Sequence, residues 1–256
     1  MAEARRGGAS RLVENGSRAW LPAGLIALGI FGGGLMAGQG FTAARLGDRF
    51  VTVKGVAERD VEADLAVWTI QFSAGGNQLA EVQRTIDRNL QLTLDFLESH
   101  EISSSLVQVE GVRVVDAQAN AYQQGPINSR FSVTQTVVVR SEQPRLVEAA
   151  AQDIGTLVEN GVVLISGQEY GPGGPTFLFR GLNDIKPEMI AEATARAREA
   201  AVEFARDSGA EIGGIRRANQ GVFEILPRDP APGVMEQNRI EKTVRVVSTV
   251  EYLLRE

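Results

Sequence analysis

The sequence predicts an α+β domain of two βαββ-like halves, with helices packed on antiparallel sheet and one transmembrane helix ahead of them. Three observations support this fold class. Residues near the N-terminus form an uncharged apolar segment, several segments alternate in hydrophobicity, and long stretches carry apolar residues at helical spacing. The order strand, helix, strand, long polar loop, strand describes residues 65–139 and again residues 176–254. This repeated order indicates two similar units that share one layered core.

Composition limits the chemistry that the chain can perform. The 256 residues are 43% hydrophobic, which suits one folded domain of about 200 residues with additional segments. No cysteine is present, so disulfides, thiolate zinc sites and cysteine nucleophiles are excluded. His100 is the single histidine, so a site with several histidine ligands is excluded as well. Beyond residue 45 the chain is acidic, which argues against nucleic acid as a partner.

The segment Trp20–Phe41 contains no charged residue and is long enough to span a bilayer as a helix. Four arginines precede it, which favours an N-terminus in the cytoplasm. We therefore expect a single-pass protein of the bacterial inner membrane, with its folded domain in the periplasm. The expected divisions are a basic cytoplasmic segment at 1–19, a signal anchor at 20–41, a linker at 42–49 and a periplasmic domain at 50–256. The alternative is a cleaved signal peptide and a secreted periplasmic domain, for which Gly38-Gln39-Gly40 offers only a poor cleavage site.

Glycines in the anchor recur at a spacing that allows close helix packing in lipid. Gly29 and Gly33 form one G-x-x-x-G pair, and Gly34 and Gly38 form a second. We predict that anchors from different copies pack through these glycines in a homo-oligomer. The alternative is that a glycine-rich segment contains such pairs by chance.

Alternating and helical patterns place the elements of the domain. Strands are expected at 50–56, 65–73, 106–115, 131–139, 162–166, 176–180, 212–225 and 242–254, and helices at 78–99, 144–159 and 185–208. Asn77 is a candidate cap for the first helix, Pro144 suits the first turn of the second, and Gly161 and Gly209 suit helix ends. The expected buried stripes are Leu79, Val82, Ile86, Leu90, Leu94 and Leu97 on the first helix, and Ile190, Ala193, Ala197, Ala201 and Phe204 on the third.

Three acids at alternate positions, Asp60, Glu62 and Asp64, suggest either a cation site or the solvated edge of a strand. A flat row cannot surround a cation, and like charges protect an exposed edge from pairing, so we predict the edge. His100 follows Ser99 near a helix end, but no G-x-S-x-G elbow is present. We predict that His100 interacts with the helix end rather than with a nucleophile.

Two loops are also candidates for binding. Gly171–Pro175 is rich in glycine but lacks the lysine of a phosphate loop, so a turn or an oligomer contact is expected. A polar loop with Asn120, Tyr122, Gln123, Gln124 and Asn128 suggests a solvated loop, or alternatively a site for a partner or glycan. We predict no catalytic, cofactor or metal residues.

The ordered motifs of residues 50–254 resemble the SIMPL domain family of bacterial periplasmic and outer-membrane antigen proteins. The resemblance rests on Val51-x-Val53-x-Gly55-x-Ala57, on Asp64-Leu65-Ala66, and on the alanine-rich helix that precedes Gly209. Ala63 departs from the family, which usually has proline before this aspartate. The resemblance implies an α+β fold of two βαββ-like halves, an envelope location and, in some members, ring-like oligomers. It supplies no catalytic mechanism.

These observations favour a membrane-anchored, non-enzymatic and oligomeric envelope scaffold or stress-related module. A binding module for an envelope ligand or partner is the alternative, and a hydrolase is the third hypothesis. A deep apolar pocket between helices and sheet would favour the binding module.

Overall fold

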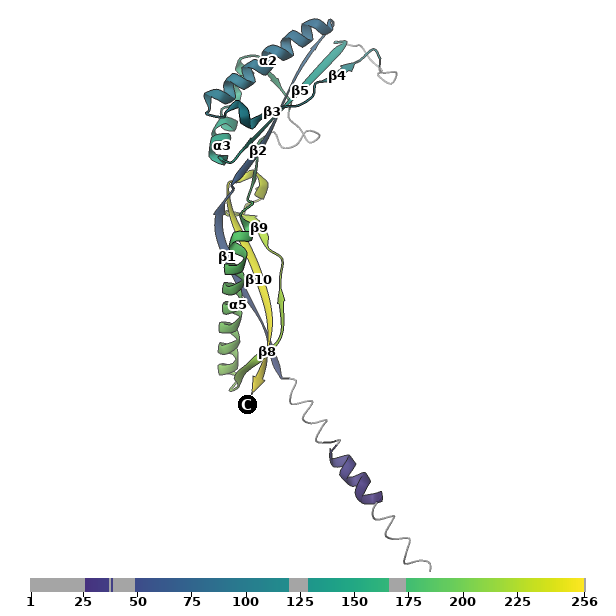
Figure 1. The fold of residues 1–256 in the computed structure, drawn as a ribbon, viewed down its shortest axis with the longest axis vertical. Helices are drawn as coiled ribbons and strands as arrows, with labels where there is room; N and C mark the ends of the chain where they lie inside the picture. The colour runs from purple at the N-terminus through teal and green to yellow at the C-terminus, as the bar shows by residue number, and fades with distance from the viewer. Residues whose placement is uncertain (1–25, 37, 39–48, 120–128, 166–173, 256) are drawn as a thin grey trace, which may run out of the picture. The chain divides into compact units, whose positions relative to one another are not determined.

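The structure is a computed structural model that describes residues 26–36, 38, 49–119, 129–165 and 174–255. These residues fall into two compact units. The larger contains residues 53–200 and 218–250, and the smaller is drawn from residues 1–52, 201–217 and 251–256. Within the described part, helices pack on two antiparallel sheets (Figure 1). The predicted α+β class is therefore confirmed.

The elements follow the predicted order with shifted bounds. The strands are β1 (Phe50–Glu62), β2 (Leu65–Gly76), β3 (Val107–Val109), β4 (Arg113–Asp116), β5 (Phe131–Ser141), β6 (Val163–Leu164), β7 (Thr176–Leu178), β8 (Glu211–Gln220), β9 (Glu224–Pro227) and β10 (Glu241–Arg255). The helices are α2 (Leu79–Ser99), α3 (Pro144–Gln152), α4 (Gly155–Glu159) and α5 (Leu182–Asp207), with 3-10 turns η1 (Ser104–Leu106) and η2 (Glu236–Asn238).

The first sheet has the order β3-β5-β2-β6, with β4 also paired to β5 and β7 to β2. Its central pair, β2 and β5, is in register from Ala66 opposite Ser141 to Gly76 opposite Phe131. Alternate residues of both strands are buried because α2 packs across this face. The core here includes Trp68, Ile70, Phe72, Val133, Val137 and Val139 with Val82, Ile86, Phe96 and Leu97 of α2.

The expected strand at 106–115 is interrupted in the structure. Val109 lies opposite Val137 and Arg113 opposite Thr134, so this strand has one more residue than β5 between the two pairs. Such an insertion is a β-bulge, which breaks the ladder locally. The side-chain amide N–H of the buried Gln135 donates a hydrogen bond at 2.5 Å to the carbonyl of Glu110, which lies in the bulge. This contact satisfies a backbone group that the ladder leaves without a partner.

The second sheet has the order β1-β10-β8, and β9 also pairs with β10. Every second residue of β10 from Lys242 to Tyr252 is buried. The buried residues of α5 follow a four-residue spacing: Met189, Ala193, Ala197, Ala201 and Ala205. Ala57, Met189, Ala193, Val244 and Val246 form one apolar cluster between this helix and the sheet. The buried stripe predicted for this helix began at Ile190 and ended at Phe204, and both ends were wrong. Ile190 is only half-buried, and Phe204 is 52% exposed.

Strand β1 approaches α5 unusually closely. A Cβ atom added to Gly55 would lie 1.8 Å from the carbonyl oxygen of Ala193 and 2.4 Å from the backbone nitrogen of Ala197. Only glycine on the strand and small residues on the helix permit this separation. The family-like motif Val51-x-Val53-x-Gly55-x-Ala57 is thus the part of β1 that faces α5.

The predicted start of the second repeat was wrong. The strand expected at 176–180 is β7, which pairs antiparallel with β2 in the first sheet. The place beside β10 is taken by β1. Hydrophobic alternation identifies the buried face of a strand but not its neighbour, so sequence order alone misassigned this strand.

Helix ends also differ in part from the predictions. The N-cap of α2 is Gln78, while the Asn77 side chain instead accepts a hydrogen bond from the Arg130 backbone at 3.1 Å. The helix expected at 144–159 is broken between α3 and α4, although Pro144 does occupy the first turn. Gly161 and Gly209 end helices with positive φ, as predicted.

The smaller unit contains the start of β1, most of β8 and the end of β10. Leu254 donates its backbone N–H to the Arg49 carbonyl at 2.9 Å, and the Arg216 guanidinium lies 4.2 Å from the centre of the Phe50 ring. Residues 26–36 and 38 are helical, and an added Cβ at Gly29, Gly33, Gly34 or Gly38 would meet no atom within 4 Å. In the part of the chain that the structure describes, no helix is both long and apolar enough to cross a membrane.

Candidate functional site

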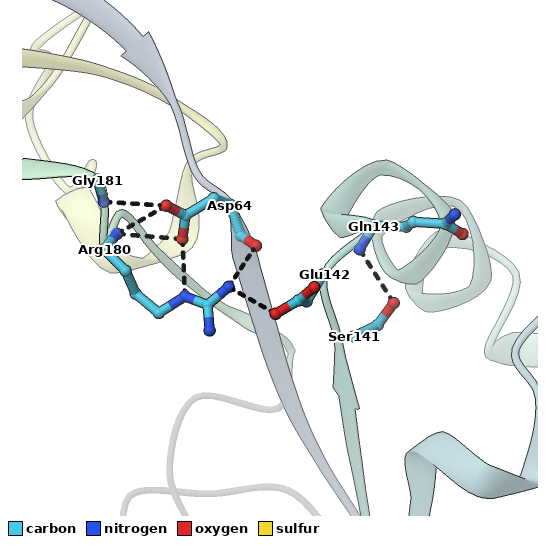
Figure 2. A network of polar contacts seen from close by, with 6 residues as sticks. All are labelled: Asp64, Ser141, Glu142, Gln143, Arg180 and Gly181. Atoms are coloured by element: carbon cyan, nitrogen blue, oxygen red, sulfur yellow. Dashed lines mark hydrogen bonds and ion pairs between the residues drawn. The ribbon is translucent and has the colours of Figure 1, made fainter. Parts of the chain in front are cut away.

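A network of polar contacts surrounds the turn that joins β1 to β2 (Figure 2). The Asp64 carboxylate accepts hydrogen bonds from the backbone N–H groups of Arg180 and Gly181, each at 3.0 Å, and from the Arg180 guanidinium at 3.1 Å. The same guanidinium donates to Glu142 at 2.9 Å. The network thus ties the β1–β2 turn to the residues after β7 and to the entry of α3. Asp64 has a structural role that its place in the Asp64-Leu65-Ala66 motif did not reveal.

Arg145 on α3 forms a second set of ion pairs. Its guanidinium donates to Glu62 of β1 at 2.8 Å and to Glu241 of β10 at 2.9 Å. The hydrogen bond from Arg145 lowers the pKa of Glu241 below its usual range, with help from a backbone hydrogen bond. One cation on α3 therefore holds the last residue of the edge strand β1 and the first residue of its neighbour β10.

Lys242 is the fully buried cation of β10. Its ammonium donates to the Glu236 carbonyl at 2.8 Å and forms an ion pair with the Glu236 carboxylate. A buried charge is costly unless it is paired and hydrogen-bonded, and both conditions are met here. The consequence is that η2 is fixed to the start of strand β10.

An open hollow lies among the elements that these three cations hold. It has a volume of about 340 Å³ and is lined by Glu148, Ala151 and Gln152 of α3, by Gly174, Pro175 and Phe177 at β7, and by Asn238 of η2. One cation holds each wall in place: Arg145 belongs to α3, Arg180 follows β7, and Lys242 of β10 binds η2. All of its described lining residues belong to the larger unit.

The predicted acid row does not converge on one point. Asp60 accepts a hydrogen bond from the Thr243 hydroxyl at 2.6 Å, Glu62 pairs with Arg145, and Asp64 turns toward Arg180. Within the described residues, no three His, Cys, Asp or Glu side chains are grouped so that they could hold a metal ion. The two acids on β1 are therefore cross-strand and inter-element partners on an exposed face, as the edge interpretation expects.

His100 is the C-cap residue of α2. Its Nδ1 lies 2.9 Å from the Phe96 carbonyl oxygen and 3.2 Å from the Ser99 hydroxyl, and its Nε2 lies 3.3 Å from Asp153. The Ser99 hydroxyl donates to the same Phe96 carbonyl at 2.7 Å. Serine and histidine thus share a backbone acceptor at the helix end, and this arrangement does not direct a base at the serine proton.

Other predicted sites lie partly outside the described residues. Asn120, Tyr122, Gln123, Gln124 and Asn128 are in this category, as are the first three residues of Gly171–Pro175. The last two residues of that loop, Gly174 and Pro175, line the hollow.

Sequence reasoning missed the three cations of the network. Lys242 carried a usable signal, because it occupies an inward position in the strict alternation that continues with Val244 and Val246. Arg145 and Arg180 carried none, since their partners are far away in sequence.

Comparison with known proteins gives the family but little more. Residues 51–252 match the family described as "SIMPL: Protein of unknown function (DUF541)". No curated protein matches the chain. Two solved structures from Listeria innocua are similar over 74% of this chain and 90% of theirs: an uncharacterised conserved protein (11% identity, TM-score 0.20) and a protein titled a hydrolase (10% identity, TM-score 0.19). The family match spans most of the chain, and the chain therefore belongs to the SIMPL family.

Proposed function

We propose that this protein is a non-enzymatic, oligomeric scaffold or stress-related module of the bacterial envelope. In this proposal one N-terminal helix anchors it in the inner membrane, and its α+β SIMPL domain lies in the periplasm. The observation that carries the non-enzymatic assignment is the use of its ionisable groups. Asp64, Glu62 and His100 are each engaged in contacts that join elements or end a helix.

The membrane and oligomer parts of the proposal are supported by the sequence. The uncharged segment Trp20–Phe41 has basic residues before it, and its glycines have the spacing of helices that associate in lipid. The resemblance to SIMPL proteins, some of which form ring-like oligomers, adds to this support. The alternative of a cleaved leader and a free periplasmic domain predicts a shorter mature chain.

The oligomer is tested with the full chain in a mild detergent. We expect the mass of the particle, measured by light scattering, to be a multiple of the chain mass. Gly33→Leu and Gly34→Leu should each lower that multiple, because leucine prevents close approach of the anchors. Gly32→Leu is the matched control, since Gly32 belongs to neither G-x-x-x-G pair. A monomeric mass for the unmodified chain would refute the oligomer, and identical masses for all three variants would refute the glycine contact.

A second candidate function is a binding module for an envelope ligand. The hollow between α3, β7 and η2 favours it, because its volume lies within the roughly 300–1,000 Å³ range of ligand sites. It is not the deep apolar pocket that the sequence argument required. A hydrolase is a third candidate, and loss of a measured activity in His100→Ala or Asp64→Asn would revive it.

A further inference from the structure

The hollow lined by Glu148, Gln152 and Asn238 presents polar groups that the fold itself does not use. None of these three side chains forms a hydrogen bond or an ion pair with another described residue. This contrasts with the acids of the network, which all have partners. One carboxylate and two primary amides together provide several acceptors and four amide N–H donors.

The rest of the lining is apolar. Phe177 is 3% exposed and belongs to the core, while Ala151 and Pro175 are half-buried beside it. A ligand in the hollow would therefore meet polar groups and an apolar wall together. Sites that bind small polar molecules commonly combine a few placed polar groups with apolar walls.

The charge of the lining selects among ligands. Glu148 is the one charged residue in the described lining, so the site is negative and disfavours phosphates, sulfates and carboxylates. A peptide would need backbone partners or a side-chain pocket for each alternate residue. A pyranose ring instead has vicinal hydroxyl groups for carboxylate and amide partners and a C–H face for proline and alanine.

The walls are held in place before any ligand arrives. Arg145 lies one helical turn before Glu148 and is bound to Glu62 and Glu241. Arg180 follows Phe177 and is bound to Asp64, and Lys242 holds the 3-10 turn that carries Asn238. Pre-organisation of this kind reduces the entropy lost on binding. It also gives the fully buried Lys242 a use beyond stability, since buried ion pairs stabilise proteins only weakly.

From these contacts we infer that the hollow between α3, β7 and η2 is a binding site for a neutral sugar, with Glu148, Gln152 and Asn238 as its hydrogen-bonding residues. This inference deepens the second candidate function and does not depend on the oligomer. It gives that candidate function a ligand class and a site.

The test uses the full chain in lauryldimethylamine oxide, a detergent without a sugar headgroup. The probes are neutral N,N′-diacetylchitobiose, anionic N-acetylneuraminic acid and the peptide trialanine, and binding is measured by isothermal titration calorimetry. We expect the neutral sugar to bind and the anionic sugar to bind at least about tenfold more weakly, because of Glu148. Trialanine should not bind.

Two variants and two matched controls assign the binding to the hollow. Gln152→Ala and Asn238→Ala should each weaken binding of the neutral sugar by about tenfold, the loss expected for one good hydrogen bond. Gln220→Ala and Asn219→Ala remove the same groups from exposed positions on β8 and should leave binding unchanged. Circular dichroism confirms that each variant is folded, and the two site variants give independent readings.

Three results would overturn the inference. The first is that the neutral sugar does not bind at a concentration of about 100 mM, which is 100 times the dissociation constant of a weak ligand (about 1 mM). The second is that Gln152→Ala and Asn238→Ala bind the neutral sugar as tightly as the control variants on β8. The third is binding of trialanine in place of the sugar, which would indicate a peptide site. A monomeric particle that still binds the sugar would refute the oligomer alone, so the two proposals fail separately.

Discussion

At the scale of single residues, three helices end in the same way but with different residues. After α2, α4 and α5 the chain adopts positive φ at Glu101, Gly161 and Gly209, respectively. In each case the next residue donates its N–H back to the last turn, as in Ile102 to the Leu97 carbonyl at 3.0 Å. This is the Schellman motif, in which glycine is favoured because other residues are strained at positive φ. Glu101 is the exception.

Glu101→Gly should therefore stabilise the protein. The φ of Glu101 is 62°, and glycine at such a position removes a strain of about 1 kcal/mol. Thermal unfolding should show a melting temperature higher by a few degrees. Gly161→Ala is the reciprocal variant, at φ 86°, and should lower the melting temperature by a similar amount. A lower melting temperature for Glu101→Gly would show that the glutamate side chain contributes more than its backbone costs.

At the scale of elements, the contact between β1 and α5 depends on the absence of side chains. Gly55 faces the backbone of Ala193 and Ala197, and the buried stripe of the helix is alanine at three consecutive four-residue steps. Small residues allow the helix axis to lie close to the sheet, so the two backbones exclude solvent without large side chains. Overpacking at such a contact forces the backbones apart.

Gly55→Ala should be severely destabilising. The added methyl group would overlap the Ala193 carbonyl, and the cost should be about 3 kcal/mol or more, since neither backbone can give way as a side chain could. Urea unfolding monitored by circular dichroism measures the change. Gly214→Ala on β8 is the control, because its added Cβ meets no atom within 4 Å, and it should not destabilise the protein. Equal stabilities for the two variants would contradict the close approach.

The elements themselves were largely predictable, and their partners were not. Helical spacing located α2 within one residue, and alternation located β2, β5 and β10. Periodicity reports which face is buried, so it could not show that β7 pairs with β2 while β1 joins β10. The residues of the candidate site were harder to predict from the sequence than the elements. Arg145 reaches Glu62 and Glu241 across 83 and 96 residues, and no local pattern reports a contact of that range.

At the scale of the whole molecule, carboxylates paired with arginines couple stability to pH. The pKa of Glu241 is lowered by Arg145, that of Glu188 by Arg59 and that of Asp116 by Arg130. A carboxylate with a lowered pKa in the folded state contributes stability above its usual pKa. The contribution is lost as the pH falls through the lowered value.

The melting temperature should therefore decrease as the pH falls below the usual values of 4.5 for glutamate and 3.8 for aspartate. Glu241→Gln should lower the melting temperature at pH 7 and give a smaller decrease at acid pH. Glu211→Gln, at an exposed end of β8, should behave like the unmodified protein. Because these pairs are largely exposed, the effect should shrink in high salt. An unchanged pH profile for Glu241→Gln would contradict a role for this ion pair.

The pairing of β1 with β10 has a consequence for how the protein is made. β1 (Phe50–Glu62) pairs with β10 (Glu241–Arg255), and all the other described strands of the domain lie between them in the sequence. Domains emerge from the ribosome N-terminus first, and contacts between distant segments slow folding. Until residues 241–255 are synthesised, β1 lacks the strand with which it pairs. The exposed edge of β1 is therefore open to aggregation until β10 is made, and loss of residues 241–255 would deprive β1 of its partner.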